Sequence, residues 1–306
     1  MKYLFALLLF LIGTFQGKAQ PENSKSILGK DKGNTLLKVG LETSTISYIN
    51  TVTNDSAGVG AYLAGDIDYN HKSGLGLNLK TYAVLAGHNP GIYLTTITPY
   101  FAKYTGKLLP YISYTRYLQN DNPSIPYSPI QNEIYAHLKI NTRYLDPMLG
   151  LDFGFGNDEK DNNRSVSDIN AFAGVSHLFA KENFGPKGKQ AFGIRPLLQL
   201  NAGTDRYFEF LRSTSYLSHG STASRMGYGG GRGTGNSGNS TSMTANTYLI
   251  SESYDFGLSN IEANLYIIYF YGKFSLEPSG SLYFPLRGTD RTPFGYWQIN
   301  LNYWIK

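Results

Sequence analysis

Two His-x-Ser triplets carry the residue spacing in this chain that most directly suggests nucleophilic catalysis. They are His71-Lys72-Ser73 and His219-Gly220-Ser221. In an extended strand, residues i and i+2 lie on the same face, so an imidazole could accept the proton of the serine hydroxyl. Chance matches are expected in a chain with five histidines and abundant serine. The spacing therefore permits a hydrolase without requiring one.

Other motifs give weaker indications of chemistry. The run Gly233-Thr234-Gly235-Asn236-Ser237-Gly238 matches the dinucleotide glycine pattern, but it neither follows a clear strand nor opens a helix. His137 and His177 have no histidine or carboxylate at metal-ligand spacing on the same face. The chain has no cysteine, which excludes disulfides, thiolate metal sites and a lipoprotein anchor. We therefore expect neither a metal nor a cofactor.

The N-terminus has the pattern of an export signal. Met1-Lys2 supplies a short positive region, Tyr3 to Ile12 is apolar, and Gly17-Lys18-Ala19 offers small residues for a signal peptidase. Residues 1–19 are thus predicted to be a signal peptide, cleaved before Gln20. Loss of Lys2 and Lys18 lowers the formal net charge from +5 to about +3, which gives no support for nucleic-acid binding.

Alternating apolar and polar side chains recur in segments of about ten residues along the rest of the chain. The clearest example runs from Ile134 to Arg143, where Ile134 and Leu138 share one face while Lys139 and Arg143 share the other. The same alternation occurs at 59–68, 75–80, 149–155, 194–202, 261–267, 273–282 and 297–305. With less regular segments at 91–103, 108–118 and 168–179, and a first strand near 42–53, we expect about twelve strands.

The connections and the aromatic residues favour a membrane barrel over a soluble sandwich. Short turns alternate with longer loops, the longest of which spans 206–254 and contains a Gly/Ser/Asn-rich tract. Aromatic residues gather near the segment ends, where the two membrane interfaces would lie. They are Tyr69, Tyr82, Tyr100, Phe101, Tyr144, Phe179, Phe284, Trp297, Tyr303 and Trp304.

These features resemble the outer-membrane β-barrels of Gram-negative bacteria over roughly Thr43 to Ile305. The glycine-aromatic strand 146–156, the hairpin 271–278 and an aromatic-rich last strand carry the resemblance, although the chain ends Trp304-Ile305-Lys306 and not on the aromatic itself. The resemblance implies an all-β, transmembrane, antiparallel up-and-down barrel at 43–306, preceded by a periplasmic lead-in at 20–42. It also implies outer-membrane lipid and the barrel-assembly machinery as partners.

The alternation predicts which charged residues line the lumen. They are Asp66, Asp68, Lys80, Glu133, Lys139, Arg143, Asp152, Arg195, Glu262, Lys273 and Glu277, with Arg116 as a further candidate. The two signs nearly cancel, which favours a network of ion pairs over a constriction selective for one sign of charge.

Three functions remain open at this stage. The leading prediction is a narrow or passive pore for small solutes, and the alternative is a closed structural or accessory barrel. The third is a lipid hydrolase, because outer-membrane phospholipases and lipid A deacylases are similar barrels with a His-x-Ser pair facing lipid. His71 falls in an expected periplasmic turn, His219 falls in the long loop, and neither serine is followed by asparagine. We therefore predict that the protein is not an enzyme.

Overall fold

The computed structural model describes residues 36–48, 58–84, 90–120, 129–159, 162–204, 256–286 and 294–305. This part of the chain consists of strands joined by turns, with a single turn of 3-10 helix, η1 (Pro186–Gly188). The strands are β1 (Leu36–Tyr48), β2 (Gly58–Asn70), β3 (Leu75–Val84), β4 (Gly91–Ala102), β5 (Leu108–Gln119), β6 (Ile130–Ile140), β7 (Asp146–Asp158), β8 (Arg164–Ser176), β9 (Phe179–Phe184), β10 (Gln190–Gly203), β11 (Gly257–Tyr271), β12 (Phe274–Pro285) and β13 (Phe294–Ile305).

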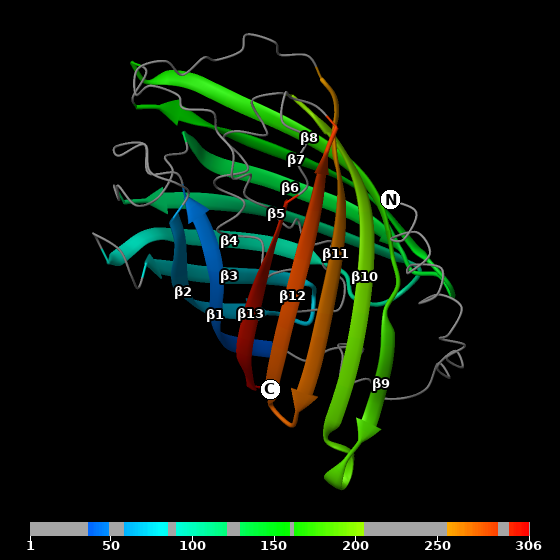
Figure 1. The fold of residues 1–306 in the computed structure, drawn as a ribbon. Helices are drawn as coiled ribbons and strands as arrows, with labels where there is room; N and C mark the ends of the chain where they lie inside the picture. Colours follow the sequence, from blue (N-terminus) through cyan, green and yellow to red (C-terminus); the bar gives the residue numbers. More distant parts are fainter. Residues whose placement is uncertain are drawn as a thin grey trace.

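The strands form one closed antiparallel sheet (Figure 1). Apart from β8 and β9, which do not pair with each other, strands that are consecutive in the sequence pair side by side. β1 pairs with β13 from Leu37↔Ile305 to Ser44↔Gln298, which closes the ring. Closure matters in lipid because it leaves no open sheet edge around the ring. Both β8 and β9 pair with β10, at opposite ends of it, so the thirteen strands occupy twelve positions. The predicted twelve-position antiparallel barrel is confirmed.

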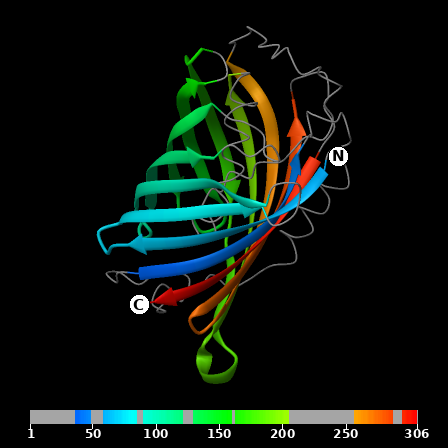
Figure 2. The ribbon, with the colours of Figure 1, turned by 90° about the vertical axis from the view of Figure 1, so that its left-hand side faces the viewer.

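The segment predicted as one strand at 168–179 is in fact divided between β8 and β9. Here β8 pairs with Leu197–Gly203 of β10, while β9 pairs with Gln190–Ile194. The β9–β10 hairpin extends beyond the rest of the barrel (Figure 2). Asn183 and Gly185 adopt positive φ at its end, and η1 follows directly. This hairpin explains why the connection at 181–190 is long for a simple turn.

One end of the barrel is formed by short turns at 71–74, 103–107, 141–145 and 272–273, and we call it the turn rim. The start of β1 and the end of β13 lie at this rim, because Leu37 pairs with Ile305. In bacterial barrels the short turns and both termini lie on the periplasmic side. The long connections leave from the opposite end, the loop rim. Residues 1–35 and 205–255 lie outside the described residues, and with them the predicted signal peptide and the loop 206–254.

The first strand begins earlier than the sequence analysis predicted. It starts at Leu36, inside the segment 20–42 that was interpreted as a lead-in, and it ends at Tyr48. Leu37, Val39 and Leu41 alternate with Lys38 and Gly40, so the two-residue period was already present in the sequence. The boundary predicted at 43 therefore falls inside β1.

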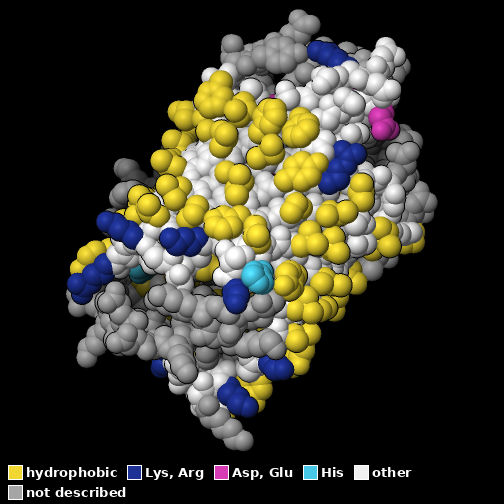
Figure 3. Space-filling model, turned by 180° about the vertical axis from the view of Figure 1, so that it is seen from behind, with side chains coloured by type: hydrophobic (Ala, Val, Ile, Leu, Met, Phe, Trp, Pro, Cys, Tyr) yellow, Lys and Arg dark blue, Asp and Glu magenta, His cyan; other side chains and the backbone are white. Residues whose placement is uncertain are grey.

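The barrel carries its apolar side chains outside and its polar ones inside. Outward residues such as Ile67, Leu79, Leu138 and Leu149 are exposed, whereas their inward neighbours are buried. In Figure 3, hydrophobic side chains cover much of the surface, and lysine and arginine side chains lie mainly near its margins. Strands of this length span a bilayer when tilted. Within the described residues, no helix has the length and apolar character needed to cross a membrane.

Two aromatic residues predicted at the interfaces point inward instead. Tyr82 is 0% exposed and Tyr100 is 4% exposed, whereas Tyr144 is 71% exposed at the turn rim and Trp297 is 47% exposed on the outer wall. Their positions in the two-residue alternation explain the inward direction. Tyr82, for example, lies on the same face of β3 as the inward residues Asn78 and Lys80.

Candidate functional site in the barrel lumen

Most of the charged residues predicted to line the lumen have buried, inward-pointing side chains. They are Asp66, Asp68, Lys80, Glu133, Lys139, Asp152, Arg195, Glu262 and Glu277, none of which is more than 4% exposed. They come from seven strands around the ring, β2, β3, β6, β7, β10, β11 and β12. The lumen is therefore the candidate functional site.

Arg143 and Lys273 do not belong to this set. Both lie in turns at the turn rim and are exposed, and their cations sit over the rings of Tyr144 and Tyr303. The alternation was extended past the ends of the strands, where the pleat no longer fixes a side chain's direction. Arg116 also points away from the lumen, and its guanidinium donates to Asn132 Oδ1 at 2.9 Å on the outer wall.

Several buried charges were missed, and they change the balance. Lys38 was assigned to the lead-in, Asp146 began the predicted strand 146–156 without a side-chain direction, and Asp168 fell in one of the less regular segments. Among the described residues, nine acidic and four basic side chains are buried, the acidic set including Asp158 near the loop rim. The predicted near-cancellation of charge is therefore wrong, and the lumen has an excess of acidic groups.

A polar network joins β1, β2, β3 and β4 in the half of the barrel nearer the turn rim. Lys38 Nζ lies 2.8 Å from Asp66 Oδ2. Asp68 accepts hydrogen bonds from Tyr100 Oη at 2.9 Å and from Asn78 Nδ2 at 3.3 Å. Asn78 Nδ2 also lies 3.4 Å from Asp66 Oδ2, so the same amide links the ion pair to Asp68, and such added hydrogen bonds help to offset the cost of burying the pair. At the rim, burial raises the pKa of Tyr104, whose hydroxyl accepts from Asn70.

Further polar contacts line the rest of the wall. Lys139 Nζ lies 3.8 Å from Asp146 Oδ2 between β6 and β7, and Tyr117 donates to Glu133 between β5 and β6. Nearer the loop rim, amides form a chain in which Asn201 accepts from Gln199 at 2.7 Å and donates to Asn260 at 2.8 Å. These contacts join neighbouring strands, so they stiffen the wall.

An aromatic cluster occupies the inner wall over β4, β5, β6 and β8. It consists of Tyr100, Tyr111, Tyr135, His137 and Phe172. The rings of Tyr111 and His137 are stacked with centroids 5.2 Å apart, and those of Tyr135 and Phe172 are stacked at 5.7 Å. Met148, Leu197 and Tyr266 pack against it, which extends the packing to β7, β10 and β11. Half of the ring therefore contributes to one packed mass inside the barrel, which narrows the lumen.

A second apolar group lies inside the turn rim near the β9–β10 hairpin. Ala191, Ile268 and Phe270 are buried there, and Trp304 packs against them. Burial lowers the pKa of His177, between β8 and β9, and its ring meets Phe179 edge-on.

The wall over β12, β13 and β1 is polar, with atoms that lack partners. Ser275 Oγ donates to Glu277 Oε1 at 2.6 Å and accepts from Asn302 Nδ2 and from Trp304 Nε1. Its hydrogen-bonding capacity is then used. Glu277 Oε2, Asn302 Oδ1 and both amide atoms of Asn300 are buried with no hydrogen-bond partner. Sequence reasoning placed Asn300 and Asn302 on the inner face but assigned them no role, because they carry no charge.

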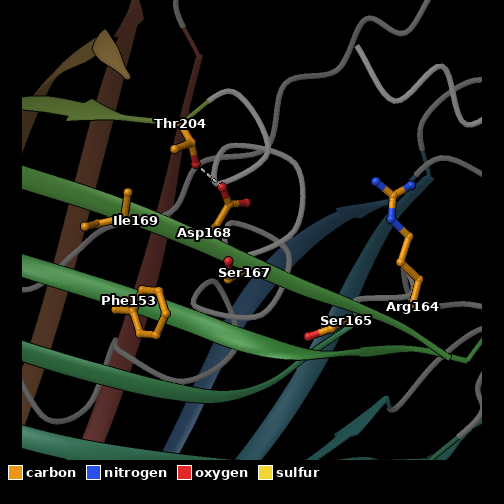
Figure 4. A pocket seen from close by; sticks show the side chains of 7 residues that line it. All are labelled: Phe153, Arg164, Ser165, Ser167, Asp168, Ile169 and Thr204. Atoms are coloured by element: carbon orange, nitrogen blue, oxygen red, sulfur yellow. Dashed lines mark hydrogen bonds between the residues drawn. The ribbon is translucent and has the colours of Figure 1, made fainter. Parts of the chain in front are cut away.

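A pocket of about 270 Å³ lies at the loop rim near the end of β10. Its lining comes from β7, β8 and Thr204, and Thr204 donates a hydrogen bond to Asp168. In Figure 4, Arg164 extends away from this bonded pair. The one acidic residue that lines this pocket, Asp168, already accepts a hydrogen bond.

The His71–Ser73 pair has a structural role in a turn. His71 Nδ1 lies 2.9 Å from Ser73 Oγ and also accepts from the Ser73 backbone N–H, while Gly74 adopts φ of 93°. Within the described residues, no carboxylate is bonded to His71 to orient its ring, as a catalytic base requires. The second triplet, His219-Gly220-Ser221, lies outside the described residues. No group of three or more metal-ligating residues occurs in the described chain.

A closed antiparallel barrel with an apolar outside and a polar inside has the inverted pattern of an outer-membrane β-barrel. That class follows from the strand pairing and the two faces of this chain. No protein-family model matches the sequence, and no curated protein matches it either.

Solved structures with a related overall shape include several outer-membrane proteins. A NanC porin shares 7% sequence identity with a TM-score of 0.39, covering 88% of this chain and 99% of that one. An outer membrane channel from Pseudomonas putida F1 shares 12% with a TM-score of 0.43, covering 93% and 98%. LpxR from Salmonella typhimurium shares 8% with a TM-score of 0.42, covering 87% and 99%. At these values the similarity is one of general shape.

Proposed function

We propose that this outer-membrane barrel is a narrow pore for small polar solutes. The observation that carries the proposal is the continuous polar column on β13, where Gln298, Asn300 and Asn302 point inward and are all buried. The column continues on β12 and β11 through Glu277, Ser281 and Asn264, so polar groups extend from one half of the barrel to the other. A polar wall of this kind lowers the cost of dehydrating a polar solute.

The aromatic cluster sets the expected size limit. It lies on β4 to β8, and β6 stands six positions from β13 in the ring of twelve, on the opposite wall. A solute would therefore pass between the aromatic cluster and the polar column. Because the apolar side chains project into the lumen, we expect small conductance rather than the large currents of wide porins.

Planar bilayer recording tests this proposal. Purified full-length protein is expected to produce discrete single-channel steps in KCl, and liposomes containing it should swell in small sugars more slowly than those containing a wide porin. A preparation that folds, as shown by heat-dependent gel mobility, and yet gives no steps in repeated insertions would contradict the pore.

The second candidate, a closed structural or accessory barrel, is favoured by the near-complete burial of the lumen side chains. Phe172 is 4% exposed and Leu197 is 3% exposed, values typical of a packed core. One variant distinguishes the two candidates, because they predict different results for it. Replacing both Phe172 and Leu197 by alanine is expected to raise the single-channel conductance severalfold if a pore exists, and to destabilise the barrel without producing current if the lumen is closed.

We also propose that the protein does not hydrolyse lipid. The His71–Ser73 pair is accounted for by its turn, at the rim opposite the outer leaflet if the termini are periplasmic. Phospholipid and lipid A hydrolysis by the purified protein should match the rate of a His71→Ala, His219→Ala double variant. A clear rate in the parent protein that the double variant loses would contradict this.

Export and assembly form part of the same proposal. The signal at residues 1–19 would direct the chain across the inner membrane, and the barrel-assembly machinery would insert the strands. Mass determination of the mature protein from the outer-membrane fraction is expected to show Gln20 as the first residue.

A further inference from the structure

Glu277 is a buried carboxylate whose charge is not balanced in the described structure. It is 1% exposed, and its single hydrogen bond comes from Ser275 Oγ to Oε1. Within the described residues, its second oxygen, Oε2, has no hydrogen-bond partner, and no lysine or arginine forms an ion pair with it. A buried carboxylate is costly unless it is paired or binds a cation. Lys273, which is close in sequence, is exposed in its turn and lies over Tyr303 on the outer wall.

Two amides beside Glu277 add oxygen atoms that also lack partners. Asn300 is opposite Glu277 in the β12–β13 register, and Asn302 is opposite Ser275. Because Asn302 uses its Nδ2 to donate to Ser275, its Oδ1 is left without a donor. Asn300 is 1% exposed and neither of its amide atoms is bonded. Three acceptor oxygens and one N–H donor are thus available on one patch of the wall.

Gly40 on β1 leaves room for the side-chain oxygens of its neighbours in the sheet. It pairs with Asn302 on one side and with Asp66 on the other. A Cβ atom at this position would lie 2.5 Å from Asn302 Oδ1 and 2.0 Å from Asp66 Oδ1, so both oxygens extend over the glycine. Any larger residue would push them apart. The absence of a side chain at residue 40 therefore allows the oxygens to converge.

The composition of this patch selects among possible ligands. An anion is disfavoured by Glu277 and by the excess of buried acidic groups. A neutral polyol could use the amides but would leave the carboxylate charge unbalanced. A monovalent cation, bare or as a primary ammonium group, matches several oxygen acceptors and supplies the missing charge. A divalent ion would need more carboxylates, and the described residues offer no group of three.

We propose that Glu277, Asn300 and Asn302, beside Gly40, form a binding site for a small monovalent cation in the lumen. The inference rests on the proposed pore, whose wall it occupies, and names the solute class that this wall favours. A bound cation neutralises Glu277 and satisfies the amide oxygens. In a narrow lumen such a site makes the pore selective for cations, because binding lowers the barrier to entry for that sign of charge.

Reversal potentials in a KCl gradient across a planar bilayer test the site. The parent protein is expected to be cation-selective, and Glu277→Gln should lower its K⁺/Cl⁻ permeability ratio by about threefold to tenfold. Asn300→Leu, which removes both free amide atoms at similar volume, should also lower the K⁺/Cl⁻ permeability ratio. Glu262→Gln is the matched control, because it removes an equal charge from the same lumen, where Asn264 already donates to the carboxylate at 2.8 Å. Equal losses in the two glutamine variants would overturn the site and leave the pore intact.

A second measurement does not depend on current. The thermal unfolding of the detergent-solubilised full-length protein is compared in KCl and in N-methyl-D-glucamine chloride at equal ionic strength. K⁺ should raise the unfolding temperature of the parent protein and of Glu262→Gln, but not that of Glu277→Gln. Stabilisation by K⁺ that depends on Glu277, found in a protein that gives no channel current, would refute the pore but support the cation site. No difference between the two salts for the parent protein would refute the site.

Discussion

Replacing Lys38 by methionine is expected to destabilise the barrel by about 3–5 kcal/mol, the cost of leaving one member of a buried ion pair without its partner. Lys38 is 1% exposed and its ammonium lies 2.8 Å from Asp66 Oδ2. Methionine fills most of the volume of lysine, so the loss in the free energy of unfolding comes from the missing charge and not from a cavity. Asp66 would lose this ion pair but keep its hydrogen bond from Asn78 on β3, where it is also opposite Lys80 in the register.

The measurement is urea unfolding of the protein in detergent or bilayers, followed by tryptophan fluorescence. The double variant Lys38→Met, Asp66→Leu should lose less stability than Lys38→Met alone, because the carboxylate that Lys38 balanced is removed as well. Lys72→Met is the matched control, since Lys72 is exposed in a turn at the turn rim, and it should change stability by less than about 0.5 kcal/mol. A Lys38→Met variant as stable as Lys72→Met would show that the pair contributes nothing.

The two-residue period allowed the faces and the number of strand positions to be predicted from sequence. On β6, the inward set Glu133, His137 and Lys139 follows directly from the alternation with Ile134 and Leu138. This works because a pleated strand alternates its side chains without exception until a bulge or an end. The charged residues that were assigned to the lumen from the interior of a strand, such as Glu133 and Lys139, therefore have buried side chains.

The errors occurred where that rule stops. Arg143 and Lys273 lie one to three residues beyond a strand end, where turn geometry decides the direction of the side chain. Lys38 was missed because it lies in the segment 20–42 that was assigned to the lead-in, yet its neighbours Val39 and Leu41 face outward. The division between β8 and β9 could not be predicted, because a change of pairing partner leaves no mark on the alternation.

The candidate cation site was beyond sequence analysis for a different reason. The inward direction of Asn300 and Asn302 was apparent, but many inward amides in this barrel are bonded, including Asn201 and Asn264. What distinguishes Asn300 is that its amide has no hydrogen-bond partner among the described residues. This depends on the side-chain rotamers and on Ser275, whose hydroxyl bonds Glu277, Asn302 and Trp304 instead. Gly40 contributes by the side chain that it lacks, and a sequence shows a glycine without showing which atoms lie over it.

Replacing Gly150 by alanine is expected to destabilise the barrel by about 1–3 kcal/mol, the usual cost of overpacking an interior. Gly150 on β7 is paired in the register with Phe172 on β8, and a Cβ atom there would lie 2.0 Å from Phe172 Cζ. The ring cannot simply turn away, because it stacks on Tyr135 with centroids 5.7 Å apart. The glycine thus accommodates the ring that anchors one end of the aromatic cluster.

Unfolding in urea and the heat-dependent gel mobility of the variant provide the measurement. Gly65→Ala is the matched control, because a Cβ atom at Gly65 meets nothing within 4 Å, and it should leave stability unchanged. Adding Phe172→Leu to Gly150→Ala should restore part of the loss, since the shorter side chain vacates the space that the new methyl group needs. If the double variant is less stable than the sum of the two single changes predicts, the contact between residues 150 and 172 is not the source of the strain.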